Sequence, residues 1–354
     1  MKFMGYRRNN GKVGIRNHVL ILATSVCSNK VAEDISHAVE GSTYINNTYG
    51  CCQLGADFEL TKKTIINTGK NPNVGAVLIV GLGCEGVEPL DIYEAIKETG
   101  KPVEKITIQE ERGTLNAYAK GVAIARKFVQ ELSLEERVEC DISEIILGME
   151  CGGSDTTSGL ASNPTCGVCS DMIIDFGGTS ILSETTEFIG AEHVVAKRGK
   201  NEKVSKEIIE LVKNCEEKAM LLGVDIRGGQ PTPGNIVGGI TTIEEKSLGC
   251  IHKSGTKEFQ GVLEYADIPQ TKGLYIMDTP GQDIESITGM VAGGAQIIIF
   301  TTGRGTPTGN PISPVIKLTG NKFTFDSMID NIDFDASKII TGEESINETG
   351  NKLF

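Results

Sequence analysis

Four cysteines stand in glycine-flanked loops, and their thiols are the side chains of this sequence best suited to chemistry. They are Cys51 and Cys52 in YGCCQ, Cys84 in GLGCEG and Cys151 in GMECGGSD. A thiolate must approach a metal ion closely, and neighbouring glycines allow the backbone turn that this approach requires. One such cysteine alone is usually a small buried apolar residue. Because the pattern recurs in three loops, we predict that these thiols form a metal site.

The other six of the ten cysteines carry weaker signals. Cys166 and Cys169 form a C-x-x-C pair, but the pair falls at the start of a predicted helix and no second pair accompanies it. We expect both to pack in the core. No partner signal accompanies the remaining four, which we assign a structural role: Cys27, Cys140, Cys215 and Cys250.

Polar residues near these loops could bind or protonate a substrate. Glu85 and Asp155 follow two of the loop cysteines and are placed to tune a metal or to donate protons. Arginine binds a carboxylate through two parallel hydrogen bonds. The residues predicted to bind a substrate are Arg16, Ser154, Thr302 and Arg304.

His193 and Lys246 are the candidate catalytic bases. His193 lies among other polar groups in EFIGAEHVV, although a single histidine on an apolar segment is more often structural. Lys246, in TTIEEKSLG, could equally be an exposed helical residue paired with a glutamate neighbour. Both alternatives stay open from the sequence.

Strands and helices alternate along the chain. In the first half, apolar runs predict strands at residues 18–25, 43–48, 76–80 and 103–108. Helices are predicted between them, at residues 28–39, 57–67, 89–98 and 114–132. In the second half, strands are predicted at 145–147, 179–182, 273–277 and 296–300, and helices at 166–175, 203–222, 242–248 and 286–292. Such alternation indicates βαβ units and parallel sheets.

We therefore predict an α/β fold with two Rossmann-like open parallel-sheet domains, at residues 1–135 and 136–354. The charged stretch 133–141 would link them, and the Pro- and Gly-rich segment 229–239 would be a loop. Open sheets of this kind bind ligands at the carboxyl ends of their strands. The active-site loops, including those with Cys84, Cys151 and Arg304, are expected at these ends.

The composition restricts where the protein works and what it binds. A net charge of -13 argues against binding to nucleic acid or to an anionic membrane. No apolar run is long enough to span a bilayer, and the first residues do not resemble a signal peptide, so we expect a cytoplasmic protein. An acidic protein that binds an acidic metabolite needs local positive charge, from arginine, lysine or a metal ion. A G-x-G-x-x-G pattern with a ribose-binding acidic residue in the usual place is missing, so dinucleotide binding is not expected.

Several long segments resemble the large, carboxy-terminal region of the altronate and galactarate dehydratase family, over about residues 5–340. The matching segments are GYRRNNGKVGIRN, YGCC, GLGCEG, GMECGGSDTTSGLASNP, GGTSILSETTEFIGAEH, PTPGNIVGGITTIEEKSLG and GLYIMDTPGQDIESITGMVAGGAQIIIFTTGRGTPTG. Two departures stand out. The small amino-terminal SAF domain of single-chain members is absent, and Tyr49 occupies the place of the histidine in the family's His-Gly-Cys-Gly motif.

The resemblance implies a hydro-lyase that removes water from a sugar acid such as altronate or galactarate and leaves a 2-keto-3-deoxy acid. It also implies iron, as Fe²⁺ or an iron–sulfur cluster, or another divalent ion such as Mn²⁺. The expected partners are an anionic sugar acid, a separate small SAF-domain subunit and further copies of this chain. Two alternatives remain: a large subunit that eliminates sulfite from sulfolactate, and a non-catalytic metabolite-binding subunit.

Overall fold

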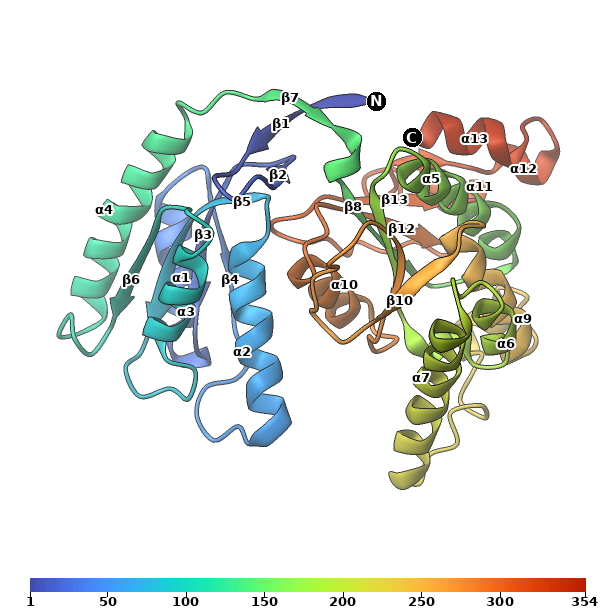
Figure 1. Cartoon of the computed structure of the whole chain (residues 1–354), viewed down its shortest axis with the longest axis horizontal. Coiled ribbons are helices and arrows are strands. Elements are labelled where there is room, and N and C mark those ends of the chain that lie inside the picture. The colour runs from blue at the N-terminus through green and yellow to red at the C-terminus, as the bar shows by residue number, and fades with distance from the viewer. The chain divides into compact units, whose positions relative to one another are not determined.

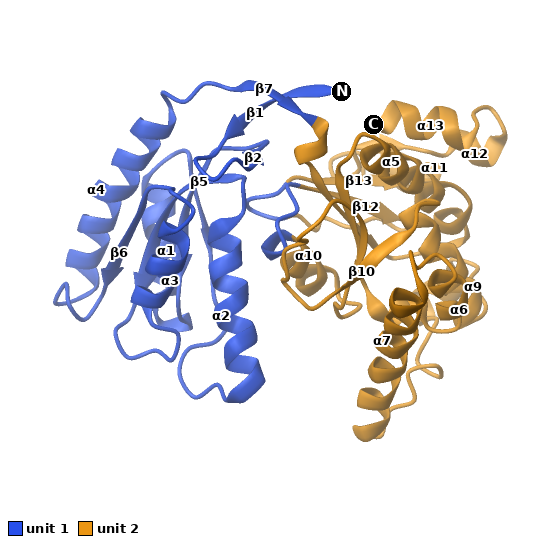
Figure 2. Ribbon diagram, in the orientation of Figure 1, with its two compact units in different colours: residues 1–141, 291–296, 310–313 blue, residues 142–290, 297–309, 314–354 orange.

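The computed structural model describes all 354 residues, which form two compact units (Figure 2). Unit 1 contains residues 1–141 with the short segments 291–296 and 310–313. Unit 2 contains residues 142–290, 297–309 and 314–354. Each unit has its own parallel sheet with helices beside it, which confirms the predicted α/β class. None of the helices combines the length and apolar character that crossing a membrane requires.

The sheet of unit 1 has four parallel strands in the order β4-β3-β5-β6 (Figure 1). The strands are β3 (His18–Ala23), β4 (Ser42–Ile45), β5 (Val74–Gly81) and β6 (Val103–Thr107). The helices are α1 (Asn29–Ala38), α2 (Gly55–Lys70), α3 (Pro89–Lys97) and α4 (Thr114–Leu132). Every strand and helix predicted for the first half is present, with ends shifted by a few residues.

Side chains alternate between the two faces of a sheet, and the central strands β3 and β5 are buried on both faces. Ile21 of β3 and Leu78 of β5 pack in one core with Ile35 of α1 and Phe128 of α4. On the opposite face, the side chains of Leu22 of β3 and Ile96 of α3 lie next to Gly69 of α2. This two-sided burial explains why β5 reads as a continuous apolar run.

Unit 1 also holds a small antiparallel sheet that the sequence did not predict. It consists of β1 (Lys2–Arg7), β2 (Val13–Gly14) and β7 (Val138–Asp141). Strand β7 falls within the stretch predicted as a linker, and it pairs with β1 from Lys2↔Asp141 to Gly5↔Val138. The pairing of two segments so far apart in sequence leaves no local signal.

The sheet of unit 2 has seven parallel strands in the order β10-β11-β9-β8-β12-β13-β14. The strands are β8 (Ile146–Gly152), β9 (Thr179–Leu182), β10 (Phe259–Leu263), β11 (Gly273–Met277), β12 (Ile297–Thr302), β13 (Val315–Thr319) and β14 (Phe334–Asp335). Four of them were predicted. The others are short, or lie in segments whose apolar pattern is weak.

Helices cover the two faces of this sheet. On one face, Met290 of α10 (Asp283–Ala292) lies against Gly148 of β8. On the other face, Asn163 at the start of α5 (Asn163–Asp175) accepts a hydrogen bond from Thr301 of β12 at 2.6 Å. Because alternate residues of β8 point to opposite faces, Glu150 points to the α10 side and Cys151 to the α5 side.

The remaining helices of unit 2 are α6 (Glu192–Ala196), α7 (Glu202–Leu221), α8 (Pro233–Val237), α9 (Ile243–Cys250), α11 (Lys322–Ser327), α12 (Lys338–Thr341) and α13 (Ile346–Leu353). The prediction that residues 229–239 form a loop was wrong at residues 233–237, which form α8. Pro233 suits the first turn of a helix, and the Thr232 hydroxyl caps it by accepting from the Asn235 N–H.

Candidate active site

Strand β8 is the point in the sheet of unit 2 at which the chain changes the side on which it adds further strands. The chain leaves β8 for β9 on one side and later places β12 on the other. A crevice that suits a ligand forms at such a switch point, beyond the carboxyl ends of the strands. The pairing of Cys151 with Thr301 and of Gly152 with Thr302 brings the loops that follow β8 and β12 together there.

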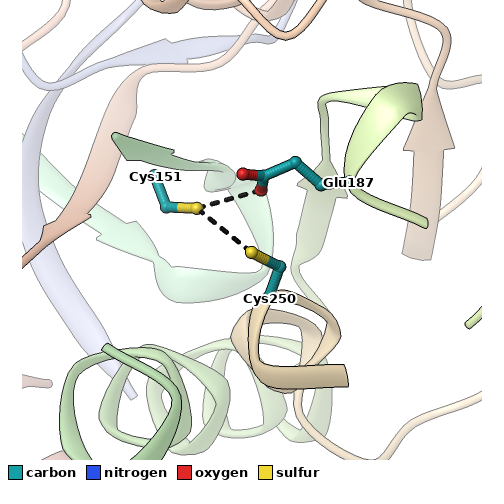
Figure 3. A group of neighbouring side chains, drawn as sticks. All are labelled: Cys151, Glu187 and Cys250. Atoms are coloured by element: carbon teal, nitrogen blue, oxygen red, sulfur yellow. Dashed lines mark hydrogen bonds between the residues drawn. The ribbon is translucent and has the colours of Figure 1, made fainter. Parts of the chain in front are cut away.

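The Cys151 thiol is at the centre of a buried group of metal-binding side chains (Figure 3). It donates a hydrogen bond to Oε2 of Glu187 at 2.9 Å, and its Sγ lies 3.7 Å from Sγ of Cys250. The three side chains come from the end of β8, from the 3-10 helix η4 (Thr185–Phe188) and from the end of α9. Their donor atoms lie within 4.8 Å of one another, so this group could hold a metal ion.

Two lysines hold the carboxylates of this group in place. The side chain of Lys253, in η5 (Ile251–Ser254), is fully buried, and its Nζ lies 3.0 Å from Glu184 Oε2 and 2.8 Å from Glu187 Oε2. Lys246 Nζ lies 3.3 Å from the other oxygen of Glu187. Glu184 Oε2 also accepts the backbone N–H of Cys151 at 3.0 Å. Buried charges are tolerated when they are paired in this way.

The neighbouring charges set the protonation of the group. Burial would raise the pKa of Glu187, but Lys253 and Lys246 outweigh it and hold that pKa well below its usual range. Burial and the adjacent Glu187 raise the pKa of Glu184 to about 7, although Lys253 opposes them. Burial would lower the pKa of Lys246, but Glu187 raises it above the usual value. Lys246 therefore acts as a cation here, whereas a base would need the neutral amine.

A cleft of about 280 Å³ leads from the surface of unit 2 to this group. One side is formed by residues after β8, including Ser154 and Asp155, and the other by α9 and η5, including Lys246, Cys250 and His252. One of the three metal-binding side chains and one of the two lysines therefore face a space that a small molecule can enter.

Asp155 stabilises the loop after β8, and both of its carboxylate oxygens are occupied. Oδ1 accepts from the Thr157 hydroxyl at 2.6 Å and from the Ser158 N–H at 3.1 Å, while Oδ2 accepts from Asn321 at 2.8 Å. Gly303 packs against it so closely that a Cβ atom there would lie 2.2 Å from Asp155 Cγ. The geometry makes Asp155 a positioning residue for this edge of the sheet.

The predicted substrate-binding residues of unit 2 lie at the same edge. The Ser154 hydroxyl is 3.7 Å from the Cys151 thiol. Thr302 is buried and its hydroxyl accepts from the Gly305 N–H at 2.8 Å. Arg304 is exposed and donates to the Gly234 carbonyl at 2.9 Å, which ties it to the segment around α8.

The predicted site residues of unit 1 form a separate set of loops. The Glu85 carboxylate accepts from the Thr24 hydroxyl at 2.6 Å and from the N–H groups of Leu82 and Cys84 at 2.8 and 2.9 Å. Burial would raise the pKa of Glu85, but these hydrogen bonds together lower it. Cys84 is exposed and accepts from Gln109 Nε2 at 3.7 Å.

The vicinal pair Cys51 and Cys52 lies in the loop beside Cys84. Both thiols are exposed, and the Gly86 N–H donates to the Gly50 carbonyl at 3.3 Å, which joins the two loops. Cys52 has a φ of 68°, an uncommon conformation for a residue with a side chain. The four predicted ligands are thus divided between unit 1 and unit 2, and a site shared by all of them stays a prediction.

Two other predicted residues lie away from the strand ends that carry the thiols. Arg16 precedes β3 and so lies at the amino end of the unit 1 sheet, where its side chain donates to the Ile15 carbonyl at 3.2 Å. His193 is exposed on α6 and lines a hollow with residues of α7 that shares no residue with the cleft. His193 thus does not join the Cys151 group of its own unit, and the roles of both residues stay predictions.

Four residues of this group were missed from the sequence: Glu184, Glu187, Cys250 and Lys253. A signal existed for the two glutamates, because they lie in the segment that follows the end of β9 at Leu182, as Cys151 lies at the end of β8. Cys250 and Lys253 had no such signal, since they lie at the end of a helix and in the turn after it. The assignment of a purely structural role to Cys250 overlooked a contact that only the fold creates.

The sequence matches two domain models of one enzyme family in succession. Residues 5–133 match the second domain of D-galactarate dehydratase/altronate hydrolase, and residues 142–354 match the C-terminal domain of D-galactarate/altronate dehydratase. The chain belongs to the galactarate/altronate dehydratase family. The two matches cover most of unit 1 and nearly all of unit 2, so the family is shown over almost the whole chain.

Characterised relatives agree with this family. The chain is 42% identical to the (2R)-sulfolactate sulfo-lyase subunit beta of Chromohalobacter salexigens, over 99% of this chain and 90% of that protein. It is 35% identical to the altronate dehydratase of Bacillus subtilis, over 98% of this chain and 70% of the relative. It is also 35% identical to the galactarate dehydratase (L-threo-forming) of Escherichia coli, over 99% of this chain and 71% of that protein. All are lyases, the dehydratases being carbon–oxygen lyases, and this member of the family is a lyase too.

Proposed function

We propose that this chain eliminates water from a sugar acid such as altronate or galactarate and forms a 2-keto-3-deoxy acid. The observation that carries the proposal is the buried group at the switch point of unit 2. There Cys151, Cys250 and Glu187 combine metal-binding atoms with two lysine cations, in a chain of the dehydratase family. The cleft beside Lys246 and Cys250 gives a sugar acid access to them.

The chemistry of the elimination requires positive charge at this place. The proton beside a carboxylate is weakly acidic, so its removal needs a cation near the carboxylate oxygens to stabilise the enolate that develops. The hydroxyl that departs needs a proton or a coordinating ion. Lys246, which holds its proton and lines the cleft, is suited to bind the substrate carboxylate. Arg304 would bind a second anionic or hydroxyl group through its guanidinium.

The donor set fits iron as the metal that the family resemblance implies. Two sulfur atoms and one carboxylate favour a thiophilic ion such as Fe²⁺ over Mn²⁺, which prefers oxygen ligands. An iron–sulfur cluster usually takes four cysteine ligands, more than this group supplies. When bound, the ion would act as a Lewis acid.

A panel assay tests the proposed reaction. The full chain, loaded with Fe²⁺ under anaerobic conditions, is incubated with altronate, galactarate and shorter hydroxy acids, and the 2-keto acid formed is measured. We expect turnover of at least one sugar acid. Failure to turn over any acid, both alone and with a small SAF-domain subunit supplied, would contradict the proposal and favour a metabolite-binding subunit.

A second candidate reaction is the elimination of sulfite from sulfolactate. It is favoured by the 42% identity to a sulfo-lyase subunit beta, which extends over 90% of that relative. Both reactions remove a proton beside a carboxylate and expel a group from the neighbouring carbon, so the same site would serve either. Sulfite and 2-keto acid measured in parallel distinguish them, because dehydration releases no sulfite.

We further infer that the chain works with a separate small subunit. The name of the sulfo-lyase relative assigns it to a multi-subunit enzyme, and the two dehydratases are longer than the region they share with this chain. Co-expression with a small SAF-domain protein followed by size-exclusion chromatography tests this. A stable complex with higher activity than the chain alone is expected.

A further inference from the structure

A short segment of unit 2, residues 230–238, lies against the loop that follows β8, and we call it the strap. It contains α8, and the side chain of Asn235 is the only one in it that is buried. The Asn235 amide donates to the Ser154 carbonyl at 2.9 Å, and the Gly238 carbonyl accepts from the Thr156 N–H at 3.0 Å. Because no apolar side chain of the strap is buried, polar contacts fix its position.

The strap also touches the loop that follows β12. The carbonyl of Gly234 accepts from the Arg304 guanidinium at 2.9 Å. At the other end, the strap is packed so closely that a Cβ atom on Gly238 would lie 2.7 Å from Cβ of Asp155. The strap therefore has a defined place beside both loops at the active-site edge of the sheet.

The first residue of the strap, Gln230, contacts Lys246 of α9. Lys246 Nζ donates to Oε1 of Gln230 at 3.2 Å and lies 3.3 Å from Oε1 of Glu187. An ammonium group carries three N–H donors at the end of a flexible four-carbon stem. An acceptor from the strap and another from η4 together fix this group, and an N–H remains for a molecule in the cleft that Lys246 lines.

The chemical nature of Gln230 suits it to this contact. A neutral amide accepts a hydrogen bond without cancelling the charge of the ammonium group. A carboxylate in the same place would pair with Lys246 and would repel an anionic acid that enters the cleft. The Glu187 carboxylate does not belong to Lys246 alone, because its other oxygen lies 2.8 Å from Lys253 Nζ.

We propose that Gln230 is a positioning residue of the active site, which holds the Lys246 ammonium group at the cleft for the carboxylate of the acid. The strap determines where the Gln230 amide lies, through its contacts at Asn235 and Gly238. The inference rests on the proposed function, in which Lys246 binds the substrate carboxylate. It predicts that loss of the Gln230 acceptor weakens the binding of the acid although the lysine itself is retained.

Gln230→Met tests the contact, because it keeps the length of the side chain and lacks the amide oxygen. The chain loaded with Fe²⁺ is assayed with altronate, galactarate and sulfolactate. For an acid that is turned over, KM should rise about 10-fold, since a hydrogen bond to a charged group is lost. The fall in kcat should be smaller than this rise, because a carboxylate is bound before and during the reaction. A merely structural defect would reduce the fraction of active protein, which lowers kcat and leaves KM unchanged.

Gln230→Glu separates the charge of the side chain from its shape. It keeps the size and the acceptor, so a structural role would be preserved, but its carboxylate pairs with the ammonium group. KM should rise at least about 10-fold. Gln270→Met and Gln270→Glu, at an exposed position before β11, are the matched controls and should leave KM and kcat unchanged. An unchanged KM in either Gln230 variant would overturn the proposal.

A double variant shows whether Gln230 acts through Lys246. Lys246→Met alone should raise KM more than Gln230→Met does, because the whole cation is lost. Adding Gln230→Met to Lys246→Met should then change KM by no more than about 2-fold, since the amide has no ammonium group to hold. A further rise as large as that of Gln230→Met alone would contradict the proposal, because Gln230 would then act on the acid independently.

Calorimetry with the same three acids measures binding without turnover, and it replaces KM where Lys246→Met is too slow to assay. Binding that Gln230→Met weakens about 10-fold, in a chain that turns over no acid, would refute the proposed function and support the role of Gln230. Turnover with a KM that the Gln230 substitutions leave unchanged would have the opposite meaning. Absence of both binding and turnover would refute both.

Discussion

The thiol of Cys250 lies 3.7 Å from the thiol of Cys151, although ninety-nine positions separate the two residues in the sequence. One residue ends a central strand and the other ends a helix that packs on the same face of the sheet. Both are buried, and the cleft reaches Cys250. Two of the predictions below concern this pair of thiols, one concerns the loop after β8, and one concerns the loop of unit 1 that contains Cys84.

The metal-free protein should form a disulfide between Cys151 and Cys250 when treated with hydrogen peroxide. The two thiols lose two protons and two electrons, the peroxide is reduced to two waters, and the sulfur–sulfur distance shortens to about 2.05 Å. Peptide mapping by mass spectrometry should find this pair linked, and dithiothreitol should restore both thiols. Protein loaded with Co²⁺ should resist the reaction, and linkage of other cysteines instead would contradict the prediction.

Removal of the metal should lower the thermal stability of the chain. An ion present at about a thousand times its Kd contributes about 4 kcal/mol, which for a unit of this size corresponds to a Tm change on the order of 10 °C. Differential scanning calorimetry with and without a chelator measures this change. Cys250→Ser should show little response to the chelator, whereas Cys215→Ser should respond as the natural chain does.

Gly303→Ala should damage the active-site edge of unit 2. The added Cβ would lie 2.2 Å from Asp155 Cγ and 2.7 Å from the Asp155 backbone nitrogen, so the loop after β8 has to move. We expect a loss of about 1–3 kcal/mol in the free energy of unfolding, together with a lower kcat. Gly309→Ala is the matched control, because no atom lies within 4 Å of its added Cβ. Equal effects of the two substitutions would disprove the role of this contact.

The loop with Cys84 should become less stable in acid. The pKa of Glu85 is lowered in the folded state by its hydrogen bonds, so its contribution to stability is complete above its unfolded value of 4.5 and is lost as the pH falls through the folded value. Glu85→Gln should cost about 1–2 kcal/mol at pH 7, allowing for partial exposure, and less at pH 4. Urea unfolding at both pH values measures this. Glu94→Gln, at an exposed position of α3, should show no such difference.

The four strands of the parallel sheet of unit 1 and the four helices beside it follow from local patterns, which is why the sequence predicted all of them. Strand β5 is an apolar run buried on both faces, and α4 has an apolar stripe that packs on it through Phe128. The antiparallel strands β1 and β7 escaped prediction because their pairing joins the two ends of a long segment. Helix α8 escaped because Pro and Gly indicate loops, although Pro233 occupies a helix start where it is favoured.

Three of the six side chains in the buried group around Cys151 could be found from the sequence by one rule. Loops at the carboxyl ends of parallel strands select Cys151 correctly, and the same rule applied to β9 selects Glu184 and Glu187. Lys253 could not be found in this way. Its local sequence resembles that of an exposed lysine, and only the burial of its neighbours makes it a buried cation paired with two carboxylates.

The sequence alone thus determined the α/β class, the family and the strand that carries Cys151, because apolar periodicity and glycine-flanked loops are local properties. The tertiary structure decided the partners of Cys151. The order of strands in the sheet of unit 2 creates the switch point, and the packing of α9 and η5 on one face brings Cys250 and Lys253 to it. These contacts depend on distances between segments far apart in the chain, which no local pattern records.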